Sequence, residues 1–261
     1  MTWYREAFGA HYAVLYAHRD TAEARRCVAW LLARLPLRDG PVLDLGCGAG
    51  RHLALLREAG VRAVGLDLSA DLLAAARRRA GVAAPLLRGD MRALPLRDGR
   101  LAAVLSLFTA FGYFGALADH DPVLAEVARV LAPGGWWVLD YLDAAAVRRE
   151  LAAGPRADAG GRGPLRWRAR RFLAPGGDRV VKEIAVTPAP GEREAAARLG
   201  IPPGGRRFRE EVALFTPEEL APRAGAHGLR LEEVAGDYDG SPATPGAPRR
   251  IMLLRREATT G

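Results

Sequence analysis

The sequence predicts an α/β protein whose core is a doubly wound, mostly parallel sheet of seven strands, with an inserted antiparallel β lobe. From residue 37 to residue 141, short apolar runs alternate with segments of helical period, as expected of strands joined by crossover helices. Beyond Glu150, a glycine-rich connection leads into alternating polar and apolar residues, which favours antiparallel strands. We therefore expect one large core with a smaller lobe attached.

The stretch from Pro41 to Arg51 lies at the centre of this pattern. It begins as an apolar strand in which Asp44 is the only charge, so we expect this carboxylate at the exposed carboxyl end of the strand, facing a ligand. Glycines at positions 46, 48 and 50 permit a sharp turn and the close approach of a bound molecule. The helix that follows offers free backbone N–H groups. The stretch predicts a nucleotide-type site.

The glycine pattern separates two kinds of nucleotide. A dinucleotide-binding loop needs a third glycine where this sequence has Arg51. The run Asp44-Leu45-Gly46-Cys47-Gly48-Ala49-Gly50 instead resembles the first motif of the class I S-adenosylmethionine (SAM) dependent methyltransferases. This resemblance implies the Rossmann-like fold of that family and a loop that wraps the methionine part of SAM.

Acidic residues also follow the next two strands. Asp67 ends the strand of residues 62–67, where a carboxylate can accept hydrogen bonds from both ribose hydroxyls of an adenosine. In the family that the chain resembles, an acid after the third strand bonds the adenine amino group, and the next residue covers the ring. The resemblance therefore implies these roles for Asp90 and Met91.

A further family feature is Leu-Ala-Pro-Gly-Gly at residues 131–135, which follows a helix and precedes the apolar strand 136–141. With it, the resemblance covers residues 37–141 well and the last strands, 229–234 and 251–254, loosely.

Residues 2–17 carry an aromatic stripe with a spacing of four residues, which predicts helix, and Gly9 is expected to split it into two short helices. A longer helix should follow from residue 21 to residue 35. The stripe resembles the segment that closes over SAM in related enzymes, which implies that its later tyrosines touch cofactor or substrate. The residues that we expect to bind SAM are Tyr12, Tyr16, Asp44, Gly46, Cys47, Gly48, Gly50, Asp67, Leu68, Asp90, Met91 and Leu107.

The methyl acceptor is expected at the carboxyl end of the fourth strand. The near-continuous apolar run 101–107 predicts a central parallel strand, and it continues into four aromatic residues within positions 108–114. Open α/β sheets bind ligands at this edge, although core packing explains Phe108 equally well. The loop 236–242 can return to the same side. The residues expected to bind the substrate are Phe108, Phe111, Tyr113, Phe114 and Tyr238.

The inserted lobe should contain three antiparallel strands. The expected strands begin at Leu165, Arg179 and Arg207, and residues 154–164 are expected to form an irregular, glycine-rich connection. Such lobes shape the acceptor pocket of many small-molecule methyltransferases. Residues 188–205, rich in proline and glycine, are a candidate mobile flap.

These elements divide the chain into three parts. We expect an N-terminal helical cap over residues 1–36, a SAM-binding core over 37–153 and 216–257, and the lobe over 154–215. The last helix should open at Thr216 with a capping box, and Pro222 should kink it or end it early.

Methyl transfer from a sulfonium is an in-line displacement, so the protein must chiefly align nucleophile, methyl group and sulfur. A general base is needed only if the acceptor arrives protonated. The sequence therefore need not contain an obvious catalytic residue, and each candidate is also open to an ordinary surface or capping role. The candidates are His18, Tyr113, His120 and Tyr141.

The composition favours a soluble cytoplasmic protein. The chain has no apolar run of transmembrane length and no long apolar region at its N-terminus. Cys27 and Cys47 lack a C-x-x-C partner, so we expect neither a disulfide nor a metal site. The net charge of +8 would suit a polyanionic partner, but Lys182 is the only lysine and the arginines are scattered, so we discount it.

The leading functional hypothesis is methyl transfer from SAM to a nitrogen or oxygen of a small metabolite. Residues 108–114 also resemble the same region in enzymes that methylate amino sugars. The alternative is an RNA methyltransferase, which the basic balance favours, although neither an Asn/Asp-Pro-Pro-Tyr/Phe motif after the fourth strand nor a Pro-Cys nucleophile is present. A NAD-dependent oxidoreductase conflicts with Arg51, and a non-catalytic SAM-binding protein stays open. The pattern determines neither the acceptor nor the oligomeric state.

Overall fold

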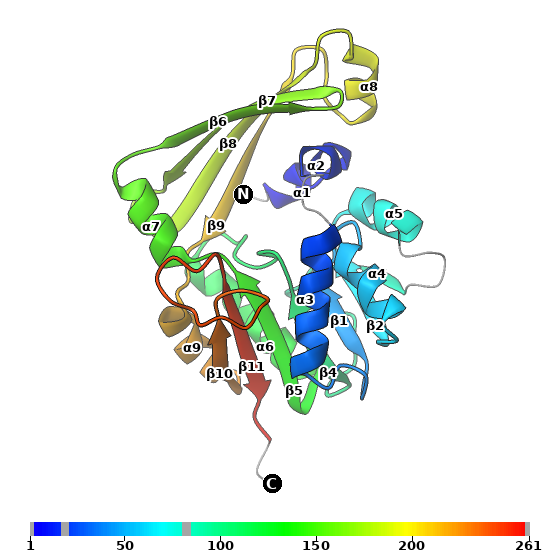
Figure 1. Ribbon diagram of the computed structural model, residues 1–261, viewed down its shortest axis with the longest axis vertical. Coiled ribbons are helices and arrows are strands. Elements are labelled where there is room, and N and C mark those ends of the chain that lie inside the picture. The colour runs from blue at the N-terminus through cyan, green and yellow to red at the C-terminus, as the bar shows by residue number, and fades with distance from the viewer. Residues whose placement is uncertain (1–2, 17–20, 80–84, 259–261) are drawn as a thin grey trace.

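The structure is a computed structural model that describes residues 3–16, 21–79 and 85–258. A mostly parallel sheet forms the body of the molecule, and an antiparallel sheet arches over its carboxyl edge, with two short N-terminal helices between them (Figure 1). The α-helices are α1 (Tyr4–Ala7), α2 (Ala10–Leu15), α3 (Thr21–Arg34), α4 (Arg51–Glu58), α5 (Ala70–Arg79), α6 (Asp121–Val130), α7 (Ala144–Ala152), α8 (Arg193–Arg198) and α9 (Pro217–Gly225).

The larger sheet has seven strands in the order β10-β11-β5-β4-β1-β2-β3. Only β11 runs in the direction opposite to the other six strands, so the predicted doubly wound, mostly parallel sheet is confirmed. The strands are β1 (Val42–Leu45), β2 (Ala63–Asp67), β3 (Leu86–Arg88), β4 (Leu101–Ser106), β5 (Leu131–Tyr141), β10 (Leu229–Ala235) and β11 (Arg250–Arg256).

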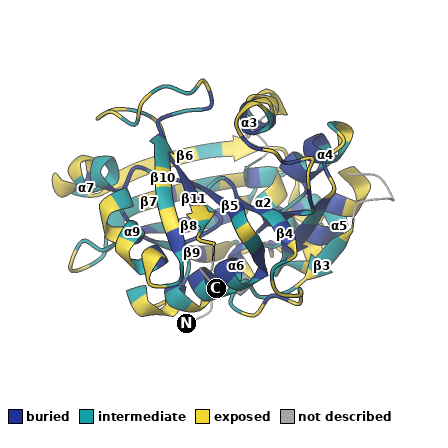
Figure 2. Ribbon diagram, turned by 90° about the horizontal axis from the view of Figure 1, so that it is seen from below, coloured by how far each residue is buried: buried dark blue, intermediate teal, exposed yellow. Residues whose placement is uncertain are grey.

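The order of the strands fixes the position of the site. The chain runs from β1 outward to β3 on one side and from β4 to β5 on the other, which leaves a crevice at the carboxyl ends of β1 and β4. Helices α3 and α4 cover one face around Leu31 and Leu53, whereas α6 and α9 cover the other around Val127 and Leu220. Figure 2 shows many buried residues in the strands of the large sheet, whereas β6 of the other sheet is mostly exposed.

The antiparallel sheet has four strands rather than the predicted three, in the order β6-β7-β8-β9. The additional strand β6 lies in the segment expected to be an irregular connection. Gly160 and Gly161 pair with Trp167 and Arg166, and a Cβ on Gly160 would come within 2.5 Å of the indole. These glycines therefore permit cross-strand packing rather than a turn. The strands are β6 (Arg156–Arg162), β7 (Leu165–Leu173), β8 (Arg179–Pro188) and β9 (Arg206–Ala213).

The segment 188–205 contains a folded element. Helix α8 forms within it, and Ala196 and Ile201 are buried against Leu165 and Val186 of the antiparallel sheet. This apolar contact gives the segment an anchor that its proline and glycine content alone does not indicate.

The N-terminal stripe forms two helices, α1 and α2, separated at Gly9 as predicted. His11 stacks on Phe208 of β9 with ring centroids 4.1 Å apart, which ties α2 to the antiparallel sheet. Helix α9 opens with the predicted capping box of Thr216 and Glu219, and it continues past Pro222 to Gly225. Within the described residues, no helix has both the length and the apolar character needed to cross a membrane.

Candidate active site

A cavity of about 520 Å³ lies at the carboxyl edge of the large sheet, beneath α1 and α2. Its lining comes from the glycine loop, from the segments that follow β2, β3 and β4, and from the N-terminal aromatic residues. This volume is in the range of small-molecule and cofactor sites. Of the residues predicted to bind SAM, those that line it are Tyr12, Tyr16, Gly46, Cys47, Gly48, Asp67, Leu68, Asp90, Met91 and Leu107.

The three glycines of the loop have different roles. All have positive φ, between 54° and 75°. A Cβ on Gly46 would lie 2.8 Å from Ala110, and one on Gly50 would lie 2.9 Å from Ala76, so these two permit tight packing. A Cβ on Gly48 would meet no described atom within 4 Å. Gly48 therefore leaves open space beside the cavity, whereas Gly50 faces α5 and lies outside the lining.

Asp44 is buried, with 1% of its surface exposed, so the expectation of an exposed carboxylate is wrong. The reason is that β1 is a central strand and the first turn of α4 covers its end, where the Leu53 backbone N–H bonds the carboxylate. Burial, reinforced by the negative charge of Asp67, raises the pKa of Asp44 to about 7. Its Oδ2 has no hydrogen-bond partner among the described residues, so it can accept one more donor.

Asp67 is held in a fixed orientation at the tip of β2. Its Oδ2 accepts a hydrogen bond from the Gly48 backbone N–H at 2.8 Å, and its Oδ1 accepts one from the Ser69 N–H at 2.8 Å. Each oxygen retains a lone pair, so the carboxylate can accept two further donors from a ligand in the cavity. The same bonds connect the glycine loop to the start of α5.

Asp90 forms an ion pair that the sequence analysis did not anticipate. The guanidinium of Arg92 bonds both of its oxygens, with Nε–Oδ1 at 3.0 Å and Nη2–Oδ2 at 2.7 Å. Arg92 also lies over the ring of Phe114, 4.6 Å from its centroid. In the sequence, only the separation of two positions between Asp90 and Arg92 could have indicated this ion pair. The same separation is equally compatible with an arginine that points into solvent.

Only some residues of the predicted acceptor wall lie on the cavity. Phe108, Tyr113 and Phe114 line the cavity. Phe111 instead points into the core, with 1% exposure, because it packs against the rings around Trp137. Tyr238 is also buried outside the lining, where its hydroxyl donates to Asp140 Oδ2 at 2.6 Å.

Of the catalytic candidates that the structure describes, Tyr113 alone lies on the cavity, and its hydroxyl donates to the Thr109 carbonyl. His120 is fully buried among aromatic rings, where burial lowers its pKa. Tyr141 is buried and donates to the Ala213 carbonyl, and burial raises the pKa of its phenol. Both are therefore parts of the core, and His18 lies outside the described residues.

Two cavity residues at the start of α4 received no role from the sequence. Arg51 and His52 line the cavity beside Phe108, and the His52 and Phe108 ring centroids are 5.3 Å apart. Burial and the positive charges of Arg51 and Arg249 lower the pKa of His52 to about 3, so its imidazole is neutral. The position directly after the glycine loop was the signal that could have indicated both.

The sequence and the fold were compared with those of known proteins, and both match methyltransferases. Residues 42–135 match the family described as methyltransferase domain. The chain is 30% identical over 246 residues to a dTDP-3-amino-3,6-dideoxy-alpha-D-glucopyranose N,N-dimethyltransferase of Streptomyces fradiae, covering 88% of this chain and 84% of the relative. It is also 30% identical over 241 residues to a cypemycin N-terminal methyltransferase of Streptomyces sp, covering 88% and 89%. The CcbJ methyltransferase of Streptomyces caelestis shares the fold, with a TM-score of 0.78 at 21% identity over 97% and 98% of the two chains.

Similarity of this extent shows the family. The chain belongs to the class I SAM-dependent methyltransferases, as the motifs predicted. It is an enzyme that transfers a methyl group from SAM.

Proposed function

We propose that this enzyme methylates an amino group of a small metabolite, with an amino sugar as the first acceptor to test. The observation that carries the proposal is the extent of the similarity. The two relatives, whose names specify N,N-dimethyl and N-terminal methyl transfer, each match 88% of the chain. That share extends beyond the SAM-binding core into the antiparallel sheet.

The residues of the cavity suit SAM, which supplies a methyl group already activated on a sulfonium sulfur. The carboxylate of Asp67, oriented by the loop and by Ser69, would accept bonds from the ribose hydroxyls. Asp90, with Arg92 beside it, would accept a bond from the adenine amino group. The unpartnered oxygen of Asp44 supports the placement of the ammonium of the methionine part near the end of β1.

The aromatic wall suits an amine as acceptor. Phe8, Phe108, Tyr113 and Phe114 line the cavity and give it an aromatic wall. Aromatic faces stabilise the sulfonium charge, and an apolar wall favours the neutral form of an amine, which attacks without a general base. The Tyr113 hydroxyl lies on this wall and donates to the Thr109 carbonyl.

The proposal includes a cytoplasmic enzyme and a small acceptor rather than RNA. Cys27 and Cys47 are free and buried, which fits a reducing compartment. Arginines of the antiparallel sheet pair within the chain, as Arg209 does with Glu183 and Glu211, which lowers the charge available to a polyanion.

Turnover of labelled SAM tests the acceptor class. We expect transfer of one or two methyl groups to a dTDP-linked amino sugar, detected by mass spectrometry, and none to the matched sugar that carries a hydroxyl in place of the amine. Transfer to the hydroxyl compound would contradict the proposal. Transfer to RNA, with none to the amino sugar or to other small amines tested beside it, would also contradict it.

The pH dependence of SAM binding tests the place of Asp44. Because its pKa is raised to about 7 in the ligand-free protein, the carboxyl group is increasingly protonated below that pH, and binding an ammonium must then release a proton. The dissociation constant should therefore rise about 15-fold as the pH falls from about 7 to about 5.5, with a slope that approaches tenfold per unit at the acid end. Asp44→Asn should bind more weakly at pH 7 and lose this slope. Calorimetry that finds the same slope in both proteins would rule out Asp44 as the source.

A further inference from the structure

Two consecutive residues at the carboxyl end of β4 have an unusual backbone conformation. Phe108 and Thr109 have φ values of 56° and 59°, in the left-handed region that side chains other than glycine rarely adopt. Such strain persists only where the surrounding structure holds it, and it concentrates at functional sites. Phe108 lies on the lining of the cavity.

Asp140, near the end of β5, holds both residues. Its carboxylate Oδ2 accepts the Phe108 backbone N–H at 2.8 Å, and its own backbone carbonyl accepts the Thr109 N–H at 2.9 Å. Asp140 has no exposed surface and does not line the cavity. It therefore acts on the site through the turn that it holds and not by touching the contents of the cavity.

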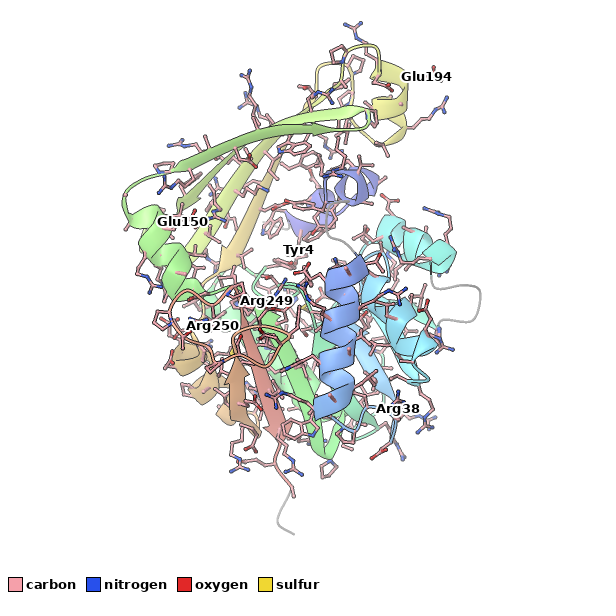
Figure 3. All side chains as sticks on the ribbon, viewed as in Figure 1. Tyr4, Arg38, Glu150, Glu194, Arg249 and Arg250 are labelled. Atoms are coloured by element: carbon pink, nitrogen blue, oxygen red, sulfur yellow. The ribbon has the colours of Figure 1, made fainter. Side chains whose placement is uncertain are left out.

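A buried network in turn orients Asp140. The Tyr238 hydroxyl donates to Oδ2 at 2.6 Å, and Arg249 Nη1 lies 3.1 and 3.2 Å from the two carboxylate oxygens. Arg249 also bonds Glu23 in the first turn of α3, and its guanidinium lies 4.3 Å from the centroid of the Phe108 ring. Figure 3 shows Arg249 at the start of β11, on the side of the large sheet that faces the N-terminal helices.

The strained turn borders the glycine-loop end of the cavity. The guanidinium of Arg51 lies 4.2 Å from the Phe108 ring centroid, and Ala110 packs directly against Gly46. Asp67 and Asp90 lie at the tips of other strands, toward β3. A shift of the turn should therefore weaken the binding of the amino-acid end of SAM more than the binding of its adenosine.

We propose that Asp140 is a positioning residue for methyl transfer. By holding the Phe108 and Thr109 amides, it fixes the wall against which the amino-acid end and the methyl group of SAM are placed. The inference rests on the orientation of SAM given under the proposed function, but not on the identity of the acceptor.

The chain provides a matched control three residues away. Asp143 is also buried, bonds Arg250 Nη2 at 2.7 Å and accepts the Ala146 backbone N–H at 3.0 Å as the N-cap of α7. It thus forms a comparable aspartate–arginine pair between β11 and the end of β5, but it holds a helix terminus and no part of the cavity lining. Asp143→Asn therefore measures how the loss of a buried aspartate–arginine pair affects stability and binding when the turn at Phe108 and Thr109 is left intact.

Two SAM analogues distinguish a specific effect on the cavity wall from a general loss of protein stability. Both contain the adenosine and the sulfur, but S-adenosylhomocysteine also contains the amino-acid end, whereas 5′-methylthioadenosine has a methyl group in its place. In Asp140→Asn we expect the ratio of their dissociation constants to shift by about tenfold against S-adenosylhomocysteine, which is the loss of about one charged hydrogen bond. Tyr238→Phe, which removes a single bond to Asp140, should shift the ratio in the same direction by about threefold. Asp143→Asn should keep the ratio within about twofold, whatever its thermal stability.

Titration calorimetry with the three variants measures the ratio of the two dissociation constants. If Asp140→Asn does not fold, Tyr238→Phe carries the test alone. Equal losses for both ligands, no loss for either, or a loss confined to 5′-methylthioadenosine would overturn the positioning role. A shift as large in Asp143→Asn would also overturn it. Because no acceptor is present, an acceptor other than an amine would leave these results unchanged, so the two proposals fail separately.

Discussion

Replacing Asp67 with alanine is expected to weaken SAM binding by about 100-fold, or roughly 3 kcal/mol. The carboxylate would accept two ribose hydroxyls, and hydrogen bonds to a charged group contribute about 1.5–3 kcal/mol each. The substitution also removes the acceptor for the Gly48 N–H, so the glycine loop loses the bond that holds it against β2. Titration calorimetry with S-adenosylhomocysteine measures the loss.

Asp71 provides the control for this substitution. It contributes a carboxylate to the same cavity from the exposed surface of α5. Asp71→Ala should change the dissociation constant by no more than about threefold. Equal losses in the two variants would mean that Asp67 acts through the general negative charge of the cavity rather than through ribose recognition.

The second large effect is expected at Phe111, where we predict a loss of stability. Phe111→Ala should lower the free energy of unfolding by about 3–5 kcal/mol, because it opens a cavity among Trp137, Tyr141 and Phe215. Phe111→Leu, which keeps most of the volume, should cost less than about 1.5 kcal/mol. Urea unfolding measures both, and SAM affinity of the folded variants should stay close to that of the parent.

Tyr113→Ala is the comparison for Phe111, since it removes a neighbouring aromatic ring that lines the cavity. We expect this variant to unfold at nearly the parent urea concentration. Stability losses in the opposite order, with Tyr113 the larger, would contradict the division of residues 108–114 into a core part and a cavity part.

The sequence predicts most of the acids and glycines that line the cavity, and it does so for a physical reason. The carboxyl ends of parallel strands meet at one edge, so acids that follow successive strands, such as Asp67 and Asp90, must lie near one another once the strand order is right. Gly48 follows from the same position in the chain, because a residue without a side chain leaves open space at the edge of the cavity.

The acceptor side could be predicted only in part. Within residues 108–114, which ring faces the cavity depends on the left-handed turn at Phe108 and Thr109, and Asp140 holds that turn from another strand. No local pattern contains this long-range bond. Tyr238 was misplaced for the same reason, since its partner Asp140 lies 98 positions away.

Local sequence patterns also could not predict which side chains are covered by other parts of the chain. Asp44 has the chemistry of a ligand-facing acid, but the first turn of α4 closes over it and leaves one oxygen without a partner. Strand β6 was expected to be a glycine-rich connection, because the packing of Trp167 against Gly160 across the ladder is not visible in the sequence. Arg92 was missed because its role depends on a bidentate geometry that sequence spacing does not specify.

A crystal structure with S-adenosylhomocysteine would test the central claim most directly. It should show the ribose hydroxyls on Asp67, the adenine amino group at Asp90, and the amino-acid ammonium at the end of β1 near Asp44, with the sulfur facing the wall of Phe108 and Tyr113. A ligand bound in the reverse orientation, or outside the cavity beneath α1 and α2, would contradict it.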